Sequence, residues 1–529
     1  MRRALVIGLL TAVTLTAVGT AGAATPRERA HLEARAALNR ALATFSGQGT
    51  DPRGATGALL DLRRQMSALA PAERRQARIL LARPTDGHNG DWTAPNNARK
   101  HLCTADFCVH WVKKTIDAPN LADKNHNGIP NYVESVRSVM TNVWNEEITT
   151  LQYQKPRPDA SSGSHNGGNP NKHIDIYLQD VGRFGLYGYC TTDDPRYSQQ
   201  SNVSAYCVFD DDFSKKQFGG AATGVAALKV TAAHEFNHAI QFSYDVREDH
   251  WFMEATATNM EATVYPSIHD NYQYFPSSPL SKANPWRPID LFQPNGGNQY
   301  GVWIFFRFLC EIYTPHPIVG QPDCAVVKDF WVRAAVDPGM KTGGTYSTKA
   351  IRDQLTADGK DFADLFRQFG AANADPAAFY KDGALYPKAG STGSDYALIA
   401  IPPDGDLDIG MFHMSNDYVR VKPDTGASSL TIDINFPGSP FTPLATVLVY
   451  DDTGALIAID EIALDGSGDA ITPYSVNPFT TTTVSKVIVV YTNAGTRFNC
   501  NNGTNLSCKG NSKDDTPGNS GYDVIFNVS

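Results

Sequence analysis

The sequence predicts an α+β protein, with a short helical segment before it and an all-β region after it. Residues 24–86 are rich in Ala, Leu, Arg and Glu and contain no cysteine. Residues 87–395 combine strand-like alternation with long helical patterns. From residue 396 onward, Thr, Val, Ile, Asp, Gly and Pro dominate, and short apolar runs alternate with turn signals. Such spacing is typical of an antiparallel β-sandwich.

Length and composition exclude several classes of protein. The 529 residues suffice for three or four domains of roughly 150 residues. An aromatic fraction of 10% excludes a mostly disordered chain. The net charge is −9, and both nucleic acids and anionic membranes select basic surfaces instead. We therefore expect neither as a partner.

The first residues predict a secretory signal peptide over residues 1–23. Arg2 and Arg3 precede an apolar run from Ala4 to about Val18, and Ala21-Gly22-Ala23 resembles a cleavage signal. The apolar run is shorter than the roughly 20 residues that a membrane span needs. We therefore expect a secreted chain without a membrane anchor.

Eight cysteines agree with export, because disulfides persist outside the cytosol. No Cys-x-x-Cys motif suggests a cysteine zinc site. The cysteines are neighbours in sequence, and local pairing would close short loops. The expected disulfides are Cys103–Cys108, Cys190–Cys207, Cys310–Cys324 and Cys500–Cys508.

The segment 24–86 predicts two helices on either side of a turn. Gly, Asp and Pro gather in residues 47–54, and Leu59, Leu62, Met66 and Leu69 then recur near the helical period. A removable helical piece after a signal peptide suits a secreted hydrolase that is made as a zymogen. We therefore expect a pro-segment, and an ordinary helical N-terminal domain is the alternative.

Individual elements can be predicted in the two later regions. In residues 87–395 we expect strands at Ile174–Leu178 and Tyr206–Phe209 and helices at about 223–244, 250–264, 298–313 and 325–336. In residues 396–529 we expect strands at Tyr418–Val421, Leu430–Ile434, Thr446–Tyr450 and Val487–Tyr491. The polar stretch 245–250 predicts a solvated turn between two helices.

The most informative motif is His234-Glu235-Phe236-Asn237-His238. Residues four apart share one face of a helix, so both imidazoles can bind one zinc ion. Glu235 directly follows the first histidine, where its carboxylate can reach the water at the open position of the metal. Apolar neighbours predict a buried helix, in which these polar groups need partners. A metal is one such partner, and hydrogen bonds between core residues are the alternative.

A catalytic zinc site needs a third protein ligand. One subclass places a histidine ten residues after the first, but Tyr244 stands there. Another subclass takes a glutamate from the following helix, and Trp251-Phe252-Met253-Glu254 offers Glu254. Glu248, Asp249 and Glu261 are its rivals. Glu254 is favoured because it lies where its helix enters the core.

At this point the chain resembles the gluzincins, the thermolysin-like clan of secreted bacterial zinc metallopeptidases. The resemblance rests on the 234–238 motif, on Trp251-x-x-Glu254-Ala-Thr-Ala and on Tyr300-Gly301, and it covers about residues 100–330. It implies a zincin-like catalytic domain over residues 87–395. Thermolysin has an Asp four residues after its Glu ligand as the residue that orients a histidine. Here that place is Thr258, so either Thr258 or Glu261 could take the role.

The resemblance implies that the chain hydrolyses peptide bonds. Glu235 would take a proton from the attacking water and pass it to the leaving amine. Related enzymes use a downstream Tyr or His as a second donor to the oxyanion, which makes Tyr300 the candidate, with His250 and His269 as weaker alternatives. Tyr206–Phe209 could be the edge strand that pairs with extended substrate.

A second metal motif predicts a calcium loop at residues 123–134. Its ligands would be Asp123, Asn125, Asn127, the carbonyl of Ile129 and Glu134, with Gly128 at the sharp turn. Only two of these ligands are anionic, so affinity should be weak and suited to extracellular calcium. The alternative is an Asx-rich turn before a helix that starts at Pro130.

Together these observations predict a secreted, monomeric zinc endopeptidase that acts on protein or peptide substrates. Its domains would be a signal peptide (1–23), a helical pro-segment (24–86), the catalytic domain (87–395) and a β-sandwich accessory domain (396–529). The alternative is a non-catalytic adhesion or matrix-binding protein whose zinc site is only structural. The intact Glu235 argues against that alternative.

Overall fold

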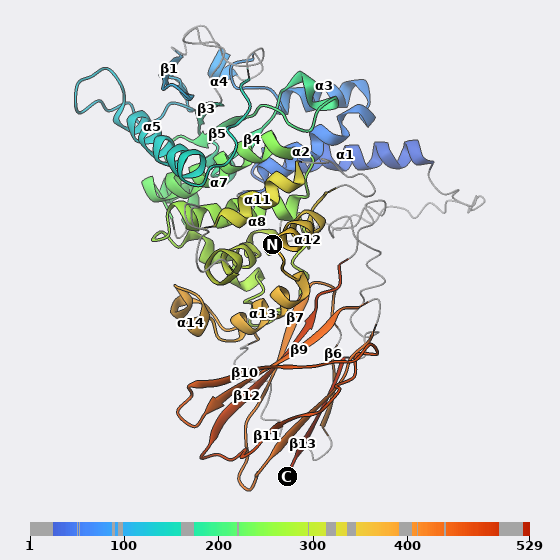
Figure 1. Ribbon diagram of the computed structural model, residues 1–529. Helices are drawn as coiled ribbons and strands as arrows, with labels where there is room; N and C mark the ends of the chain where they lie inside the picture. Colours follow the sequence, from blue (N-terminus) through green and yellow to red (C-terminus); the bar gives the residue numbers. More distant parts are fainter. Residues whose placement is uncertain are drawn as a thin grey trace, which may run out of the picture.

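Figure 1 shows the computed structural model of the chain. It describes residues 25–49, 51, 53–86, 90–93, 99–159, 174–219, 222–294, 296–313, 324–335, 345–390, 405–409, 411–438, 441–496 and 522–529. The predicted signal peptide and the pair Cys500–Cys508 lie outside these residues. The described part is α+β, with helices and a mixed sheet in its N-terminal two thirds and antiparallel sheets in its C-terminal third.

Three main helices form the N-terminal layer, where the sequence predicted two. They are α1 (Pro26–Thr44), α2 (Ala55–Gln65) and α3 (Pro71–Leu80), followed by the short α4 (Gly90–Thr93). A 3₁₀ turn at Met66–Ala68 separates α2 from α3. Pro71 starts α3, and the Glu73 carboxylate accepts a hydrogen bond from the Ala70 N–H at 2.9 Å. These two start signals explain the extra helix.

A five-stranded mixed sheet lies beside this layer (Figure 1). In spatial order its strands are β1 (Lys100–Cys103), β2 (Phe107–Trp111), β3 (Ile174–Gln179), β5 (Tyr206–Asp210) and β4 (Gly188–Thr191). Strands β2, β3 and β5 run parallel, whereas β1 and β4 run antiparallel to their neighbours. The expectation that Tyr206–Phe209 is an edge strand was wrong, because β3 and β4 flank β5 and β4 forms the edge.

Both faces of this sheet are buried except at the edge strand β1, where Lys100 and His101 are exposed. Ile176 and Phe209 belong to the core that includes α7 (Val225–Asp245), whereas Tyr177 and Val208 belong to the cluster formed with α1 and α2. Neighbouring residues of a strand point to opposite faces, so these strands are covered on both faces, and the polar side chains of Asp175 and Gln179 on β3 are buried as well. The sheet is therefore a central layer between the N-terminal helices and α7.

Helix α8 (His250–Val264) packs along α7. The remaining helices are α5 (Asn131–Trp144), α6 (Lys215–Phe218), α9 (Asn298–Gly301), α10 (Trp303–Phe308), α11 (Ala325–Ala334), α12 (Thr348–Ala357), α13 (Phe362–Ala374) and α14 (Pro376–Phe379). Shorter 3₁₀ or π turns are η2 (Asn145–Thr150), η3 (Gly182–Phe184), η4 (Pro195–Ser198), η5 (Asp270–Ser277), η6 (Leu309–Tyr313) and η7 (Gly383–Leu385).

The C-terminal region consists of two four-stranded antiparallel sheets, ordered β10-β9-β12-β7 and β11-β8-β13-β6. The strands are β6 (Gly405–Ile409), β7 (Ser415–Val421), β8 (Leu430–Asn435), β9 (Pro443–Asp451), β10 (Leu456–Ile462), β11 (Tyr474–Val476), β12 (Val484–Asn493) and β13 (Tyr522–Val528). Val447 and Val489 of one sheet share a core with Ile432 and Phe526 of the other.

Disulfides link neighbouring cysteines within the described residues. Disulfides join Cys103 to Cys108, Cys190 to Cys207 and Cys310 to Cys324, which are the expected sequence neighbours. Cys190 and Cys207 lie opposite each other on β4 and β5. Within the described residues, no helix is both long enough and apolar enough to cross a membrane.

Candidate metal centre and cleft

Three buried side chains from two packed helices converge on one point. His234 and His238 lie one turn apart on α7, and Glu254 comes from the first half of α8. The Nε2 atoms of the two histidines are 3.1 Å apart. Glu254 Oε2 lies 3.2 Å from His234 Nε2 and 3.4 Å from His238 Nε2. The structure thus brings together the three residues that the sequence proposed as ligands, and they form a group that could hold a metal ion.

The spacing of these three atoms fits a small tetrahedral ion. Bonds of about 2.0–2.1 Å place neighbouring tetrahedral ligands about 3.3 Å apart. The three observed separations, 3.1, 3.2 and 3.4 Å, lie around this value. Without a cation, two imidazole nitrogens and a carboxylate would face one another in a buried space.

Hydrogen bonds on the far side of each imidazole present Nε2 to this centre. His234 Nδ1 lies 2.8 Å from Glu261 Oε1, and His238 Nδ1 lies 2.7 Å from Gln241 Oε1. Both partners are acceptors, so each Nδ1 carries a proton, and each Nε2 can offer its lone pair to a metal once any proton on it is displaced. Glu261 therefore orients His234, whereas the buried hydroxyl of Thr258 has no hydrogen-bond partner among the described residues.

The same contacts shift the pKa values of the metal-free residues. Burial by itself would lower the pKa of His234, but its hydrogen bonds to Glu254 and Glu261 raise it to about 9. Burial disfavours an ionised Glu254, but the nearby His238 and His234 lower its pKa to about 2. These are two views of one ion pair, in which His234 carries the proton that a metal would displace.

Glu235 lies between the two histidines on α7 and is also buried. Its Oε2 accepts a hydrogen bond from the hydroxyl of Thr56 at 3.0 Å. Burial raises the pKa of Glu235, and the two histidines partly oppose this rise. A carboxylate with a raised pKa is a stronger base than an exposed one, as proton abstraction requires.

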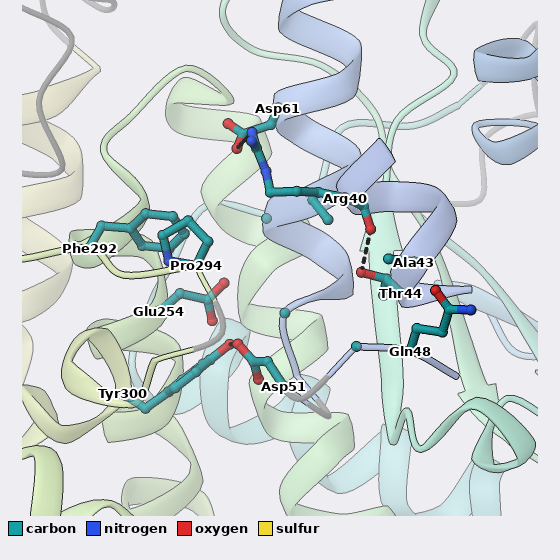
Figure 2. Close-up of a pocket in the computed structure, with 14 residues that line it drawn as sticks. Arg40, Ala43, Thr44, Gln48, Asp51, Asp61, Glu254, Phe292, Pro294 and Tyr300 are labelled. Atoms are coloured by element: carbon teal, nitrogen blue, oxygen red, sulfur yellow. Dashed lines mark hydrogen bonds and ion pairs between the residues drawn. The ribbon is translucent and has the colours of Figure 1, made fainter. Parts of the chain in front are cut away.

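Tyr300, from α9, lies beside the ligands. Its ring centre is 6.3 Å from that of His234, and its hydroxyl donates a hydrogen bond of 2.9 Å to Asp51. Figure 2 shows the carboxyl group of Asp51 next to this hydroxyl, with Glu254 close by. Tyr300 thus lies near the candidate ligands, with its hydroxyl bound to Asp51.

The two alternative histidines have other contacts. His250 Nε2 lies 2.9 Å from Asp61 and 3.0 Å from an Arg64 nitrogen, so residues of the N-terminal layer already contact this nitrogen. His269 packs against the ring of Tyr272, with their centres 4.5 Å apart. Neither contact involves the three ligand residues.

Two rivals for the third ligand position, Glu248 and Asp249, lie in the turn 245–250, and this turn is not solvated. The expectation of solvent at 245–250 was wrong, because Asp245 and Glu248 are fully buried. Arg64 of α2 donates hydrogen bonds to the carbonyls of Val246 and Glu248, and Glu248 Oε1 accepts from the Ser347 N–H. The N-terminal layer covers this turn, which local sequence could not reveal.

The end of the turn between α1 and α2 and the start of α2 contact the edge strand β4 and helix α7. Thr56, just after this turn, donates to Glu235 and accepts from the Cys190 N–H of β4 at 3.0 Å. Asp51 accepts a hydrogen bond from the Tyr300 hydroxyl. The cavity that remains between α1, α2 and Glu254 measures about 90 Å³ (Figure 2), which holds several water molecules but no extended peptide.

The sequence did not predict these contacts between the N-terminal layer and the candidate site. The run 47–54 carries only turn formers, and nothing local links Asp51 or Thr56 to side chains about 180 or 250 residues away. The one available signal was Arg53, a charged residue inside a turn that precedes an apolar helix. In the fold Arg53 is 2% exposed and pairs with Glu261 and Asp270.

The candidate calcium loop is folded around Glu134. Asp123 accepts hydrogen bonds from the N–H groups of Asn127 and Gly128, at 3.1 and 2.8 Å. The side-chain amides of Asn125 and Asn127 both reach the Glu134 carboxylate, at 3.0 and 2.6 Å. Gly128 has φ +85°, which suits the turn. Calcium binding here stays a prediction.

Two further groups in the described residues gather possible ligands. In one, the cysteine is Cys108, whose sulfur is already in a disulfide. The other joins Asp180, Asp210 and Asp211. Burial raises the pKa of Asp210 to about 7 and that of Asp211 to about 8. Asp210 already accepts from the backbone N–H groups of Gly182 and Phe213, so this group has a structural role in the loops.

Neither a scan against protein-family models nor a search of curated proteins finds a match to this chain.

Proposed function

We propose that this chain is a secreted zinc-dependent endopeptidase with a zincin-like catalytic domain of the gluzincin type. The observation that carries the proposal is the set of separations of 3.1–3.4 Å among His234, His238 and Glu254, with Glu235 between the histidines on the same helix. Three nitrogen and oxygen ligands suit zinc and leave a fourth position for water. Three disulfides agree with an extracellular location.

Zinc at this centre would polarise the scissile carbonyl and lower the pKa of water to about 7. Glu235 takes the proton that the attacking water loses and then passes it to the leaving amine. Its raised pKa brings its basicity nearer to neutral pH. Tyr300 donates its phenolic hydrogen to the oxygen that gains charge, because burial holds the pKa of Tyr300 far above neutrality and keeps the proton in place.

The helical layer of residues 24–86 acts as a pro-segment in this proposal. Thr56 engages the base Glu235, and Asp51 engages the donor Tyr300. A substrate needs both groups, so the intact chain is latent. Activity requires the removal or displacement of this segment.

A purely structural zinc site would need no second glutamate. Glu235 is a buried carboxylate whose burial raises its pKa, so keeping it there opposes stability. A non-catalytic adhesion protein would be more stable with an apolar residue at this position. The geometry therefore favours the enzyme over the adhesion alternative.

The test is hydrolysis of casein by the purified chain before and after limited proteolysis within residues 24–86. The treated chain should hydrolyse casein, a zinc chelator should stop it, and added zinc should restore it. The intact chain should be much slower. Hydrolysis that resists the chelator, or a treated Glu235→Gln variant that remains active, would remove this function.

A further inference from the structure

Arg53 fills a pocket that is built for a guanidinium group. It pairs with Glu261 near the end of α8 and with Asp270 at the start of η5. Its Cζ lies 5.5 Å from the ring centre of Tyr187 and 5.8 Å from that of Tyr274. Two carboxylates and two aromatic rings are the groups that recognise arginine in proteins.

The walls of this pocket belong to the proposed catalytic region and come from separate segments of it. Tyr187 directly precedes the edge strand β4, whereas Glu261 lies on the ligand helix α8. Glu261 also binds His234 Nδ1, so the pocket begins one side chain away from a metal ligand. Only the occupant comes from the N-terminal layer.

The occupant lies among contacts that a substrate would make. Arg53 stands between Asp51, which binds the hydroxyl of Tyr300, and Thr56, which binds Glu235 and the backbone of β4. The base, the proposed oxyanion donor and the arginine pocket are therefore all engaged by one short stretch of chain. This is the arrangement of a built-in substrate analogue.

Resting on the proposed endopeptidase function, we propose that the Arg53 pocket is the main specificity pocket of the enzyme and that its substrates carry an arginine beside the scissile bond. When the N-terminal segment leaves, Glu261 and Asp270 lose their cation. Two adjacent buried carboxylates strongly favour a new one. One oxygen of each, Glu261 Oε2 and Asp270 Oδ1, has no hydrogen-bond partner within the described residues and remains available to an incoming guanidinium.

The same geometry ranks the substrates. Arginine offers a planar fork that meets two carboxylates and stacks on aromatic rings, whereas lysine offers a single point charge. A neutral side chain would leave both carboxylates without a cation. We expect arginine to exceed lysine, and lysine to exceed leucine, with arginine over leucine on the order of 100-fold in kcat/KM.

The first arm of the test uses the full-length Arg53→Ala variant and needs no activity. Thermal unfolding is followed with and without 20 mM N-acetyl-arginine amide, with N-acetyl-leucine amide as the matched probe. The arginine probe should raise the melting temperature of Arg53→Ala by on the order of 2 °C and leave the parent unchanged. Adding Asp270→Asn should abolish the rise. Equal responses to both probes would overturn the proposal.

The second arm keeps Arg53 and so remains informative if Arg53→Ala does not fold. The chain freed of its N-terminal segment by limited proteolysis is given peptides that differ only in Arg, Lys or Leu at each position near the scissile bond. Asp270→Asn should reduce the arginine-to-leucine ratio of kcat/KM about tenfold or more, whereas Asp329→Asn, on the distant helix α11, should leave this ratio unchanged. Cleavage without arginine preference would overturn the pocket alone. Failure to cleave any peptide would instead count against the peptidase function, and the first arm would still decide the pocket.

Discussion

Replacing Glu261 by glutamine should weaken zinc binding without removing a ligand. Glu261 Oε1 lies 2.8 Å from His234 Nδ1, on the side of the ring away from the metal centre. Glutamine keeps the size and one acceptor oxygen but removes the negative charge. The imidazole of His234 then becomes a poorer donor to the metal and is held less firmly.

The size of the expected loss of zinc affinity follows from the position of Glu261 behind the candidate ligand His234. Loss of such a partner typically weakens metal affinity about 10- to 100-fold, which corresponds to about 1.4–2.7 kcal/mol. The glutamine variant should therefore still bind one zinc per chain at micromolar metal while its dissociation constant rises by this factor. Competition with a chromogenic chelator at fixed pH measures the constant.

The matched control is Thr258→Val on the same helix. The Thr258 hydroxyl is buried and has no partner in the part of the chain that the structure describes, and valine has nearly the same shape, so zinc affinity should not change. Circular dichroism of both variants checks that they are folded. Unaltered affinity in Glu261→Gln, or an equal loss in Thr258→Val, would refute the assignment of Glu261 as the residue that orients His234.

Three further predictions concern the metals and pH. Glu254→Ala should lose zinc altogether and lower thermal stability with it, because a ligand and the partner of His234 disappear together; elemental analysis that finds zinc retained would contradict this. In the metal-free chain the pKa of His234 is raised from 6.5 to about 9, so its stabilisation is complete below pH 6.5 and is lost as the pH rises through 9. Urea unfolding should show a loss on the order of 3 kcal/mol over this window, and a flat profile would count against the ion pair. If residues 123–134 bind calcium, millimolar calcium should raise the melting temperature of the parent, and Asp123→Ala should remove the rise; an unresponsive parent would leave only a turn.

Local sequence was sufficient for the elements that carry the candidate metal ligands. The spacing of His234 and His238 and the apolar positions around them predict α7, and Glu254 follows at the entry of the next buried helix. Short-loop pairing of cysteines also follows from sequence alone, as Cys190 and Cys207 on adjacent strands illustrate. These features depend on residues close together in the chain or on a pattern with a definite chemical purpose.

The contents of the cleft depend instead on distant contacts. Arg53 meets Glu261 across 208 positions, and Thr56 meets Glu235 across 179. Residues 47–54 show only that a turn forms, not where it lies. The same reason explains the error about 245–250, whose polar groups are covered by Arg64 from another layer. Burial that a separate segment creates leaves no periodic signal in the residues it covers.

The most direct test of the central claim is the comparison of the parent chain with Glu235→Gln after the N-terminal segment has been removed by limited proteolysis. Zinc content and casein hydrolysis are measured on the same samples. Glutamine cannot accept the proton but leaves His234, His238 and Glu254 in place, so both proteins should hold one zinc per chain and only the parent should hydrolyse casein. Equal hydrolysis by the two proteins, or a parent that binds no zinc, would contradict the account.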